Sequence, residues 1–469
     1  MKIMEEEKMT IKLPKDFFFG AAMSGPQTEG AWNVGGRLRS YWDMYSDQEI
    51  NAFINNVGSY VGNDMYHKYE EDIKLLKSLN FKSFRTSMQW TRLLDQDGKL
   101  NPEGAAWYHK LIDCANENGI DIFMNMYHFD MPEYLVKRGG WQNREVVEAY
   151  ANFVKIAMEE FGDKVKYEPI VEPEQQFLHG VWYPYQKDFK QSINVQYNIT
   201  LAHCLAVANF RKLKAEGKLC EGAKIGMINC FAPPYTKENP SPEDLEAVRM
   251  TDGLHNRWWL DVVAHGHLPQ DVLDTVENDW KVEINRRPGD EAILAQGKVD
   301  WLGFNYYQPT RVQAPDSKFD ENGLPCISKP YIWPERKMNV YRGWEIYPKG
   351  IYDFGMKIKK ECPDLPFFIS ENGMGVEGEE KYMDENGTVQ DDYRIEFVRD
   401  HLEWIAKAIE DGANCLGYHY WGVIDNWSWC NAFKNRYGFI RVCLDDGYKR
   451  KEKKSAAWIR EVARTNEFE

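Results

Sequence analysis

The sequence lacks several features that mark whole classes of protein. It has no unbroken apolar run of eighteen residues, and Met1 to Met9 lack the apolar stretch of a signal peptide. Its nine cysteines form no C-x-x-C pair, and their odd number does not suit a disulfide framework or a zinc site. The formal net charge is −15, and we expect the one basic run, Lys449 to Lys454, to be a solvated helix start. These absences argue against membrane and nucleic-acid partners and predict a cytoplasmic protein.

The chain has enough apolar residues to build a large core. Of its 469 residues, 43% are hydrophobic and 14% are aromatic. No internal repeat and no linker rich in glycine, proline or serine divides it. We therefore expect one catalytic domain over residues 1–469, with residues 1–10 as a disordered or extended lead. The sequence does not indicate an oligomeric state, and it permits a homo-oligomer.

Short apolar runs alternate with amphipathic stretches along the whole chain. Strands are predicted at residues 17–23, 82–87, 120–127, 165–171, 224–230, 300–306, 366–371 and 415–421. Helices are predicted at residues 63–79, 102–118, 146–161, 195–215, 392–410 and 454–465. Eight strands alternating with helices predict an α/β protein, a single (β/α)8 TIM barrel with long strand-exit loops. In such a barrel the active site lies at the carboxyl ends of the strands.

Polar side chains gather at the predicted strand ends. The apolar run of the seventh strand leads directly into Glu371, and Asn372-Gly373 then favours a turn. A single acid at such a place more often caps a turn, but the other strands end on Gln27, Arg85, His128, Asn305, Tyr307 and Trp421. Amide, imidazole, phenol and indole groups suit a sugar, which has hydroxyls at its rim and C–H groups on its faces.

Several motifs in the same order as in a known family strengthen this interpretation. They are Gln27-Thr28-Glu29-Gly30, Phe84-Arg85-Thr86-Ser87, Tyr127-His128-Phe129-Asp130, Gly303-Phe304-Asn305-Tyr306-Tyr307 and Ile369-Ser370-Glu371-Asn372-Gly373. With Tyr420-Trp421 they resemble glycoside hydrolase family 1, from about Leu13 to the last helix. The resemblance implies the same barrel and a retaining β-glycosidase that needs no metal and no cofactor.

The resemblance also implies roles for individual residues. Glu371 is expected to be the nucleophile, held and tuned by Arg85 and Tyr307. The residues expected to face the sugar hydroxyls or to stack on the substrate are Gln27, His128, Trp429, Trp344 and Trp421. Retention of configuration requires a second carboxyl group about 5–5.5 Å from the first, which acts as acid and then as base. That group should come from the fourth strand.

The fourth strand departs from the family pattern, which runs Trp-x-Thr-Phe-Asn-Glu-Pro. This chain reads Tyr167-Glu168-Pro169-Ile170-Val171-Glu172-Pro173. A match to the residues that follow makes Glu168 the acid/base and leaves part of the strand absent. A match counted from Phe161 places Glu172 a single residue short of the family spacing, and such a slip reverses side-chain direction. We favour Glu168 as the homologous residue and keep Glu172 as the one that can reach the site.

The loop after the eighth strand bears on the substrate. Ser428 stands where β-glucosidases of the family carry a glutamate, and Ser428, Lys434 and Tyr437 resemble the phosphate clamp of 6-phospho-β-glycosidases. Asn435 occupies the position of the lysine in the phospho-galactosidase branch. Because a carboxylate would repel a phosphate and a hydroxyl can donate to it, we favour a phosphorylated substrate.

Three functions therefore stay open. The favoured one is a 6-phospho-β-glycosidase, with 6-phospho-β-glucosidase preferred, that acts on a phosphorylated β-disaccharide or aryl glycoside. The second is a β-glucosidase or β-galactosidase that acts on unphosphorylated sugars. The third is a sugar-phosphate-binding protein that lost catalysis through its shortened fourth strand.

Overall fold

A closed parallel barrel stands at the centre of the molecule. The computed structural model describes residues 10–47, 57–60, 62–170, 189–429 and 431–469; the side chains of residues 167–170 fall outside this description. The barrel strands are β2 (Phe18–Ala22), β3 (Ser83–Ser87), β4 (Asp121–Asn125), β5 (Tyr167–Ile170), β6 (Lys224–Cys230), β8 (Trp301–Asn305), β13 (Phe367–Glu371) and β15 (Cys415–Trp421). They pair in this chain order, and β13 pairs with both β8 and β15 to complete the ring. The predicted (β/α)8 barrel is confirmed.

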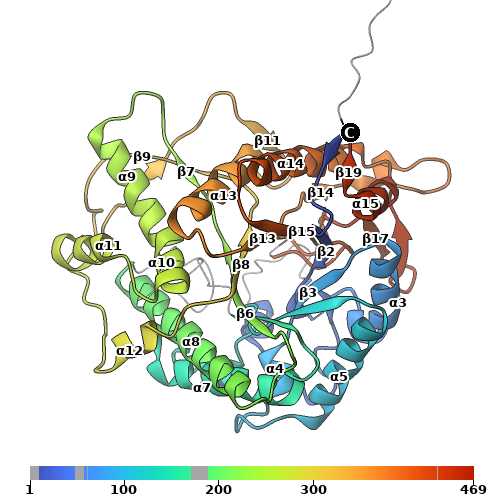
Figure 1. Cartoon of the computed structure of the whole chain (residues 1–469), viewed down its shortest axis with the longest axis horizontal. Helices are drawn as coiled ribbons and strands as arrows, with labels where there is room; N and C mark the ends of the chain where they lie inside the picture. The colour runs from blue at the N-terminus through green and yellow to red at the C-terminus, as the bar shows by residue number, and fades with distance from the viewer. Residues whose placement is uncertain (1–9, 48–56, 61, 171–188, 430) are drawn as a thin grey trace, which may run out of the picture.

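Helices surround the strands on all sides of the view in Figure 1. The longer ones are α3 (Met65–Ser78), α5 (Pro102–Glu117), α7 (Arg144–Phe161), α8 (Phe189–Ala215), α9 (Pro242–Asp252), α10 (Trp258–His265), α13 (Lys349–Glu361), α14 (Asp392–Glu410) and α15 (Lys454–Thr465). The short helices are α1 (Gly25–Thr28), α2 (Tyr41–Ser46), α4 (Trp90–Leu93), α6 (Glu133–Val136), α11 (Gln270–Asp274) and α12 (Asp290–Leu294). No helix in the described part of the chain is both long and apolar enough to span a bilayer.

The remaining strands lie outside the barrel in small sheets. They are β1 (Ile11–Lys12), β7 (Pro234–Tyr235), β9 (Thr310–Gln313), β10 (Lys329–Pro330), β11 (Lys337–Asn339), β12 (Trp344–Ile346), β14 (Val376–Glu377), β16 (Asn435–Arg436), β17 (Ile440–Cys443), β18 (Lys449–Glu452) and β19 (Glu467–Phe468). The pairs β11–β12 and β14–β16 belong to the long connections that follow β8, β13 and β15. The sequence marked these connections only as long loops.

Large side chains fill the interior of the barrel. One buried cluster takes a residue from each of four strands, Phe123, Ile228, Trp301 and Phe368, and Phe18 and Leu416 pack against it. The rings of Phe123 and Phe368 lie 5.1 Å apart between centroids. Because this layer fills the barrel below the strand ends, a ligand can be held only among the residues above it.

The basic run at residues 449–454 differs from its prediction as a solvated helix start. Residues 449–452 form β18, which pairs with β17, and only Lys454 begins α15. The guanidinium of Arg450 is buried and binds both carboxylate oxygens of Asp72 in α3, at 2.7 and 2.8 Å. Lys453 is also buried and donates to Glu379 and Asp425. The run anchors the end of the chain because its cations meet buried carboxylates.

We expect Arg450→Ala to destabilise the protein strongly. Burial already raises the pKa of Asp72, and the Arg450 guanidinium opposes that shift. Removing the cation leaves a buried carboxylate without its partner, which costs about 3–5 kcal/mol. Thermal unfolding followed by circular dichroism should show a Tm several degrees lower. Lys451→Ala, at an exposed neighbour in the same strand, should leave the Tm close to that of the wild type, and equal Tm losses in the two variants would contradict the assignment.

Candidate active site

Glu371 lies at the carboxyl end of β13 with both carboxylate oxygens bound. The Nη1 of Arg85, from β3, donates to its Oε1, and the Tyr307 hydroxyl donates to its Oε2 at 2.5 Å. Arg85 is fully buried and Glu371 is nearly so. A carboxylate bound to a guanidinium stays ionised more readily, and the two contacts also fix the direction of its plane.

Tyr307 follows β8 and remains a neutral phenol beside this charge. Burial and, next, the charge of Glu371 raise the pKa of Tyr307 well above its ordinary value. The phenol therefore keeps its proton and donates it in the hydrogen bond to Glu371. The structure brings together the three residues that the sequence predicts as one unit.

Polar residues from neighbouring strand ends lie around this unit. The amide of Gln27, in α1, is bound at both ends, because Nε2 donates to the Trp427 carbonyl at 2.8 Å and Oε1 accepts from Ser24. Asn305 ends β8 and accepts from the Ser370 hydroxyl at 2.6 Å. His128 is buried after β4, with Nδ1 3.4 Å from the Asn125 amide. Gln27 and Asn305 are thus held in fixed positions by the protein itself.

Aromatic rings form a stack next to His128. The imidazole lies 5.9 Å from the Trp421 ring and 5.8 Å from the Trp429 ring, with interplanar angles of 20° and 21°. Trp429 stacks in turn on Trp42, in α2, at 4.4 Å. Sequence reasoning missed Trp42, because the contact joins the first and eighth connections of the barrel and no local pattern indicates it.

A second group of aromatic residues lies on the side of Tyr307. The Trp344 ring, in β12, is 5.2 Å from the Tyr307 ring. Both rings pack against the buried cluster of Ala22, Trp421 and Tyr437. Trp344 and Trp421 therefore belong to one group of packed aromatic residues, which also includes the Tyr307 that binds Glu371.

In the loop after β15, the predicted phosphate-binding residues have different contact partners. Ser428 is nearly buried and lies close enough to the Tyr437 phenol to lower the pKa of that phenol. The ammonium of Lys434 points to Glu377, 3.2 Å away, and this lysine side chain is 41% exposed. The Asn435 amide is buried without a hydrogen-bond partner in the described part of the chain. The structure brings Ser428 close to Tyr437 but pairs Lys434 with Glu377.

A buried ionic network supports this loop. Arg394, in α14, donates from Nη1 to the carbonyl groups of Tyr437 at 2.6 Å and Met374 at 2.7 Å. Its charge is balanced by Glu379 and Asp391. The network ties the position of Tyr437 to the segment after Glu371, and sequence reasoning missed it because its members lie far apart in the chain.

The backbone register of β5 shows where Glu168 lies. Its Cα pairs with Ile225, near the start of β6, whereas Glu371 pairs with Asn305, which pairs with Cys230 at the end of β6. The backbone of Glu168 thus lies level with the start of β6, whereas Glu371 lies level with its end. The side chain of Glu168 and the whole of Glu172 lie outside the described residues.

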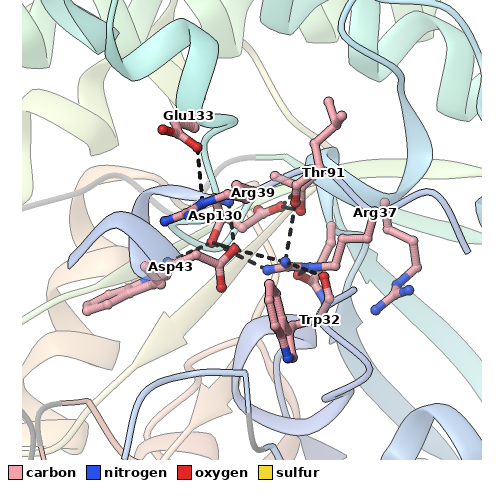
Figure 2. Close-up of polar contacts among 12 residues, drawn as sticks. Trp32, Arg37, Arg39, Asp43, Thr91, Asp130 and Glu133 are labelled. Atoms are coloured by element: carbon pink, nitrogen blue, oxygen red, sulfur yellow. Dashed lines mark hydrogen bonds and ion pairs between the residues drawn. The ribbon is translucent and has the colours of Figure 1, made fainter. Parts of the chain in front are cut away.

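A cluster of polar contacts includes Asp130, which follows His128 by two residues, together with Thr91, Arg37 and Asp43 (Figure 2). Asp130 is fully buried and accepts from the Thr91 backbone and hydroxyl, each at 3.4 Å, and from the His128 backbone. Arg37 lies nearby but pairs with Asp43 at 2.8 Å. Between His128 and Asp130, Phe129 has a φ of +65°, a conformation that is costly for a bulky residue. The hydrogen bonds to Asp130 help to hold this strained turn.

A buried acid in a closed barrel, surrounded by aromatic and amide groups, defines a carbohydrate-active enzyme, and comparison with known proteins agrees. The profile described as Glycosyl hydrolase family 1 matches residues 9–468, so the chain belongs to this family and is a glycoside hydrolase.

Individual relatives cover nearly the full chain. It is 42% identical to the 6-phospho-beta-glucosidase GmuD of Bacillus subtilis, over 97% of this chain and 98% of the relative. It is 32% identical to the Beta-glucosidase A of Acetivibrio thermocellus, over 98% and 99%. A crystal structure of the GH1 beta-glucosidase from Exiguobacterium antarcticum B7 superposes with a TM-score of 0.87 at 30% identity, over 97% and 99%.

We expect Asp130→Asn to stabilise the protein at neutral pH. Burial raises the pKa of Asp130 to about 6, against 3.8 for the free side chain. Below about pH 4 the carboxyl is protonated in both states, so it favours the native state fully there. As the pH rises through 6 the native state loses about 3 kcal/mol, because it must ionise a buried group. Asparagine keeps the acceptor oxygen and does not ionise.

The measurement is the Tm of both proteins between pH 4 and pH 7.5. The variant should exceed the wild type at pH 7.5, and the difference should shrink towards pH 4. Asp97→Asn, at an exposed position, controls for the loss of one surface charge. A Tm difference that does not change with pH would show that Asp130 does not titrate in this range.

Proposed function

We propose that this protein is a retaining 6-phospho-β-glucosidase that hydrolyses phosphorylated β-disaccharides or aryl 6-phospho-β-glucosides. The observation that carries the proposal is Ser428, which lies beside the Tyr437 phenol at the position where the family's β-glucosidases carry a glutamate. A hydroxyl pair can donate hydrogen bonds to a phosphate, which a carboxylate would repel. The 42% identity to a 6-phospho-beta-glucosidase supports the same substrate class.

In the proposed mechanism Glu371 is the nucleophile. Its carboxylate attacks the anomeric carbon, the bond to the leaving oxygen breaks, and a second carboxyl group gives that oxygen its proton. Water then attacks the covalent glycosyl ester, and the second group, now a carboxylate, takes the proton of the water. Arg85 and Tyr307 orient Glu371 during attack, and Tyr307 can strengthen its hydrogen bond again when Glu371 leaves as a carboxylate.

The backbone register bears on the choice of the second acid. A strand advances about 3.3 Å per residue. Glu168 pairs with Ile225, five residues before Cys230 in β6. Cys230 and Glu371 both pair with Asn305, so they lie at the same level of the barrel. The tilt of barrel strands changes this offset but does not remove it. Glu172 follows four residues later in the chain. We therefore favour Glu172 over Glu168 as acid/base in this chain, even though Glu168 matches the family motif in sequence.

A phosphorylated substrate also bears on location. A sugar phosphate is ionised at neutral pH and does not cross a bilayer unaided. An enzyme that uses it must work in the compartment where the phosphate is added. We propose the cytoplasm. The nine cysteines do not suit a disulfide framework, which agrees with a reducing compartment.

The phosphate preference can be measured with nitrophenyl β-glucoside and its 6-phosphate. We expect kcat/KM to be roughly 100-fold or more higher for the phosphorylated substrate, since buried donors without a phosphate stay unpaired. Ser428→Glu should lower or reverse this preference, because its carboxylate repels the phosphate. Ser428→Ala, the matched control, removes the hydroxyl without adding charge and should cause a smaller loss. Equal rates of the wild type on both substrates would exclude the proposal.

The catalytic roles can be separated by azide rescue of Glu371→Gly, Glu172→Gly and Glu168→Gly with an aryl 6-phospho-β-glucoside. Without Glu371, azide attacks the substrate from the nucleophile's side and gives the α-glycosyl azide. Without the acid/base, azide attacks the covalent intermediate from the opposite side and gives the β-glycosyl azide. We expect β-azide from Glu172→Gly, and from Glu168→Gly near wild-type hydrolysis.

Product stereochemistry is read by nuclear magnetic resonance. β-Azide from Glu168→Gly alone would reassign the acid/base to that residue. Phosphate-dependent binding with no turnover by the wild type, and turnover restored by azide or by a substrate with an activated leaving group, would instead favour the sugar-phosphate-binding alternative that lost its acid.

A further inference from the structure

The lysine expected to bind the phosphate is already engaged elsewhere. Lys434 pairs with Glu377, on the neighbouring strand β14, and its side chain is 41% exposed. Arg436, the next cation in this loop, lies 3.8 Å from Asp425. Ser428 and Tyr437 lie beside each other, while the two cations of their own loop face carboxylates. A phosphate dianion held by hydroxyls alone would lack a counter-charge.

Arg342 is a cation from another loop that lies against the same aromatic surface. It precedes β12, and its guanidinium carbon lies 4.5 Å from the centre of the Trp344 ring. Trp344 packs against the cluster that contains Tyr437 and Trp421. A guanidinium over an indole ring keeps its N–H groups available as hydrogen-bond donors.

Among the described residues, Arg342 differs from the other cations near the site because it makes no ion pair. Its Nε is buried and makes no hydrogen bond, and no carboxylate pairs with it in the described part of the chain. Arg85, Arg394 and Lys453, by comparison, all bind carboxylates. A buried donor without a partner is uncommon in proteins and is available to a hydrogen-bond acceptor that a ligand brings.

The charge of Arg342 also acts on Tyr437. Burial raises the pKa of Tyr437, and Arg342 is the largest influence in the opposite direction, ahead of the hydrogen bond from Ser428. The positive charge of Arg342 is therefore close enough to act on the Tyr437 phenol, which lies beside Ser428. An anion bound to the hydroxyls of Ser428 and Tyr437 would be attracted by the same charge.

We propose that Arg342 supplies the cation that binds the 6-phosphate of the substrate, together with the hydroxyls of Ser428 and Tyr437, and that Lys434 contributes less. This inference rests on the proposed function. A planar guanidinium can donate two parallel hydrogen bonds to phosphate oxygens, which a lysine ammonium cannot do. The specificity of this chain for a phosphorylated sugar then depends on a residue outside the loop that carries the family's phosphate-binding pattern.

The test compares kcat/KM on nitrophenyl 6-phospho-β-glucoside with kcat/KM on nitrophenyl β-glucoside, and the ratio of the two is the phosphate preference. Arg342→Gln should lower this preference roughly 30-fold or more, mainly through KM for the phosphorylated substrate. Arg342→Lys should recover part of it, because the charge returns without the planar fork. The inhibition constant of glucose 6-phosphate should rise in parallel with KM, and that of glucose should not.

Two further variants separate a specific effect from a general one. Lys434→Gln removes the competing cation and should lower the preference several-fold less than Arg342→Gln. Arg464→Gln, on α15 and paired with Glu461, controls for the loss of a positive charge elsewhere. Tm values of all variants establish that each is folded.

The outcomes distinguish this inference from the proposed function. A wild type without phosphate preference overturns the proposed function, and the assignment of Arg342 falls with it. A wild type with the preference, but an Arg342→Gln variant that keeps it, overturns the assignment alone. Equal losses on both substrates, or a larger loss in Lys434→Gln, overturn the assignment of Arg342 as well.

Discussion

The arrangement of the site depends on the Glu371 carboxylate and its two partners, Arg85 and Tyr307. Glu371 is held by a buried guanidinium on one oxygen and a phenol on the other. Each partner comes from a different strand, so the arrangement exists only when β3, β8 and β13 are in register in a closed barrel. A buried charge of this kind is tolerated because it is paired and hydrogen-bonded, and the same pairing fixes the direction of the carboxylate.

The surroundings of this group are held by further buried charges. Arg394 is fully buried between Glu379 and Asp391 and binds the carbonyl group of Tyr437. Lys453 joins Glu379 to Asp425 at the base of the loop that carries Ser428. The loop that faces the proposed phosphate is thus fixed by ions beneath it. Its own exposed cation, Lys434, lies in solvent beside Glu377. Rigid support of this kind is what a site needs if its hydroxyls are to meet a phosphate in one geometry.

Much of this arrangement can be predicted from local sequence patterns. The run from Pro366 to Glu371 followed by Asn-Gly indicates a strand with an acid at its tip, and β13 ends at Glu371. The predicted eight strands overlap the eight barrel strands, because short apolar runs and amphipathic helices have clear periods. The basic run at residues 449–454 was wrong as a solvated helix start, since hydropathy alone does not reveal that Arg450 faces a buried Asp72 on a distant helix.

By itself, the sequence determined the barrel, the strand ends and the identity of Glu371, Arg85 and Tyr307, because each follows from local periodicity or from a motif in order along the chain. Only the tertiary structure decided which side chains meet: Trp42 on Trp429, Arg394 under Tyr437, Lys434 with Glu377, and Arg342 alone on Trp344. These contacts join segments that are distant in sequence, and their energies depend on burial and on which carboxylate each cation reaches. Neither quantity is encoded in the spacing of residues along one segment.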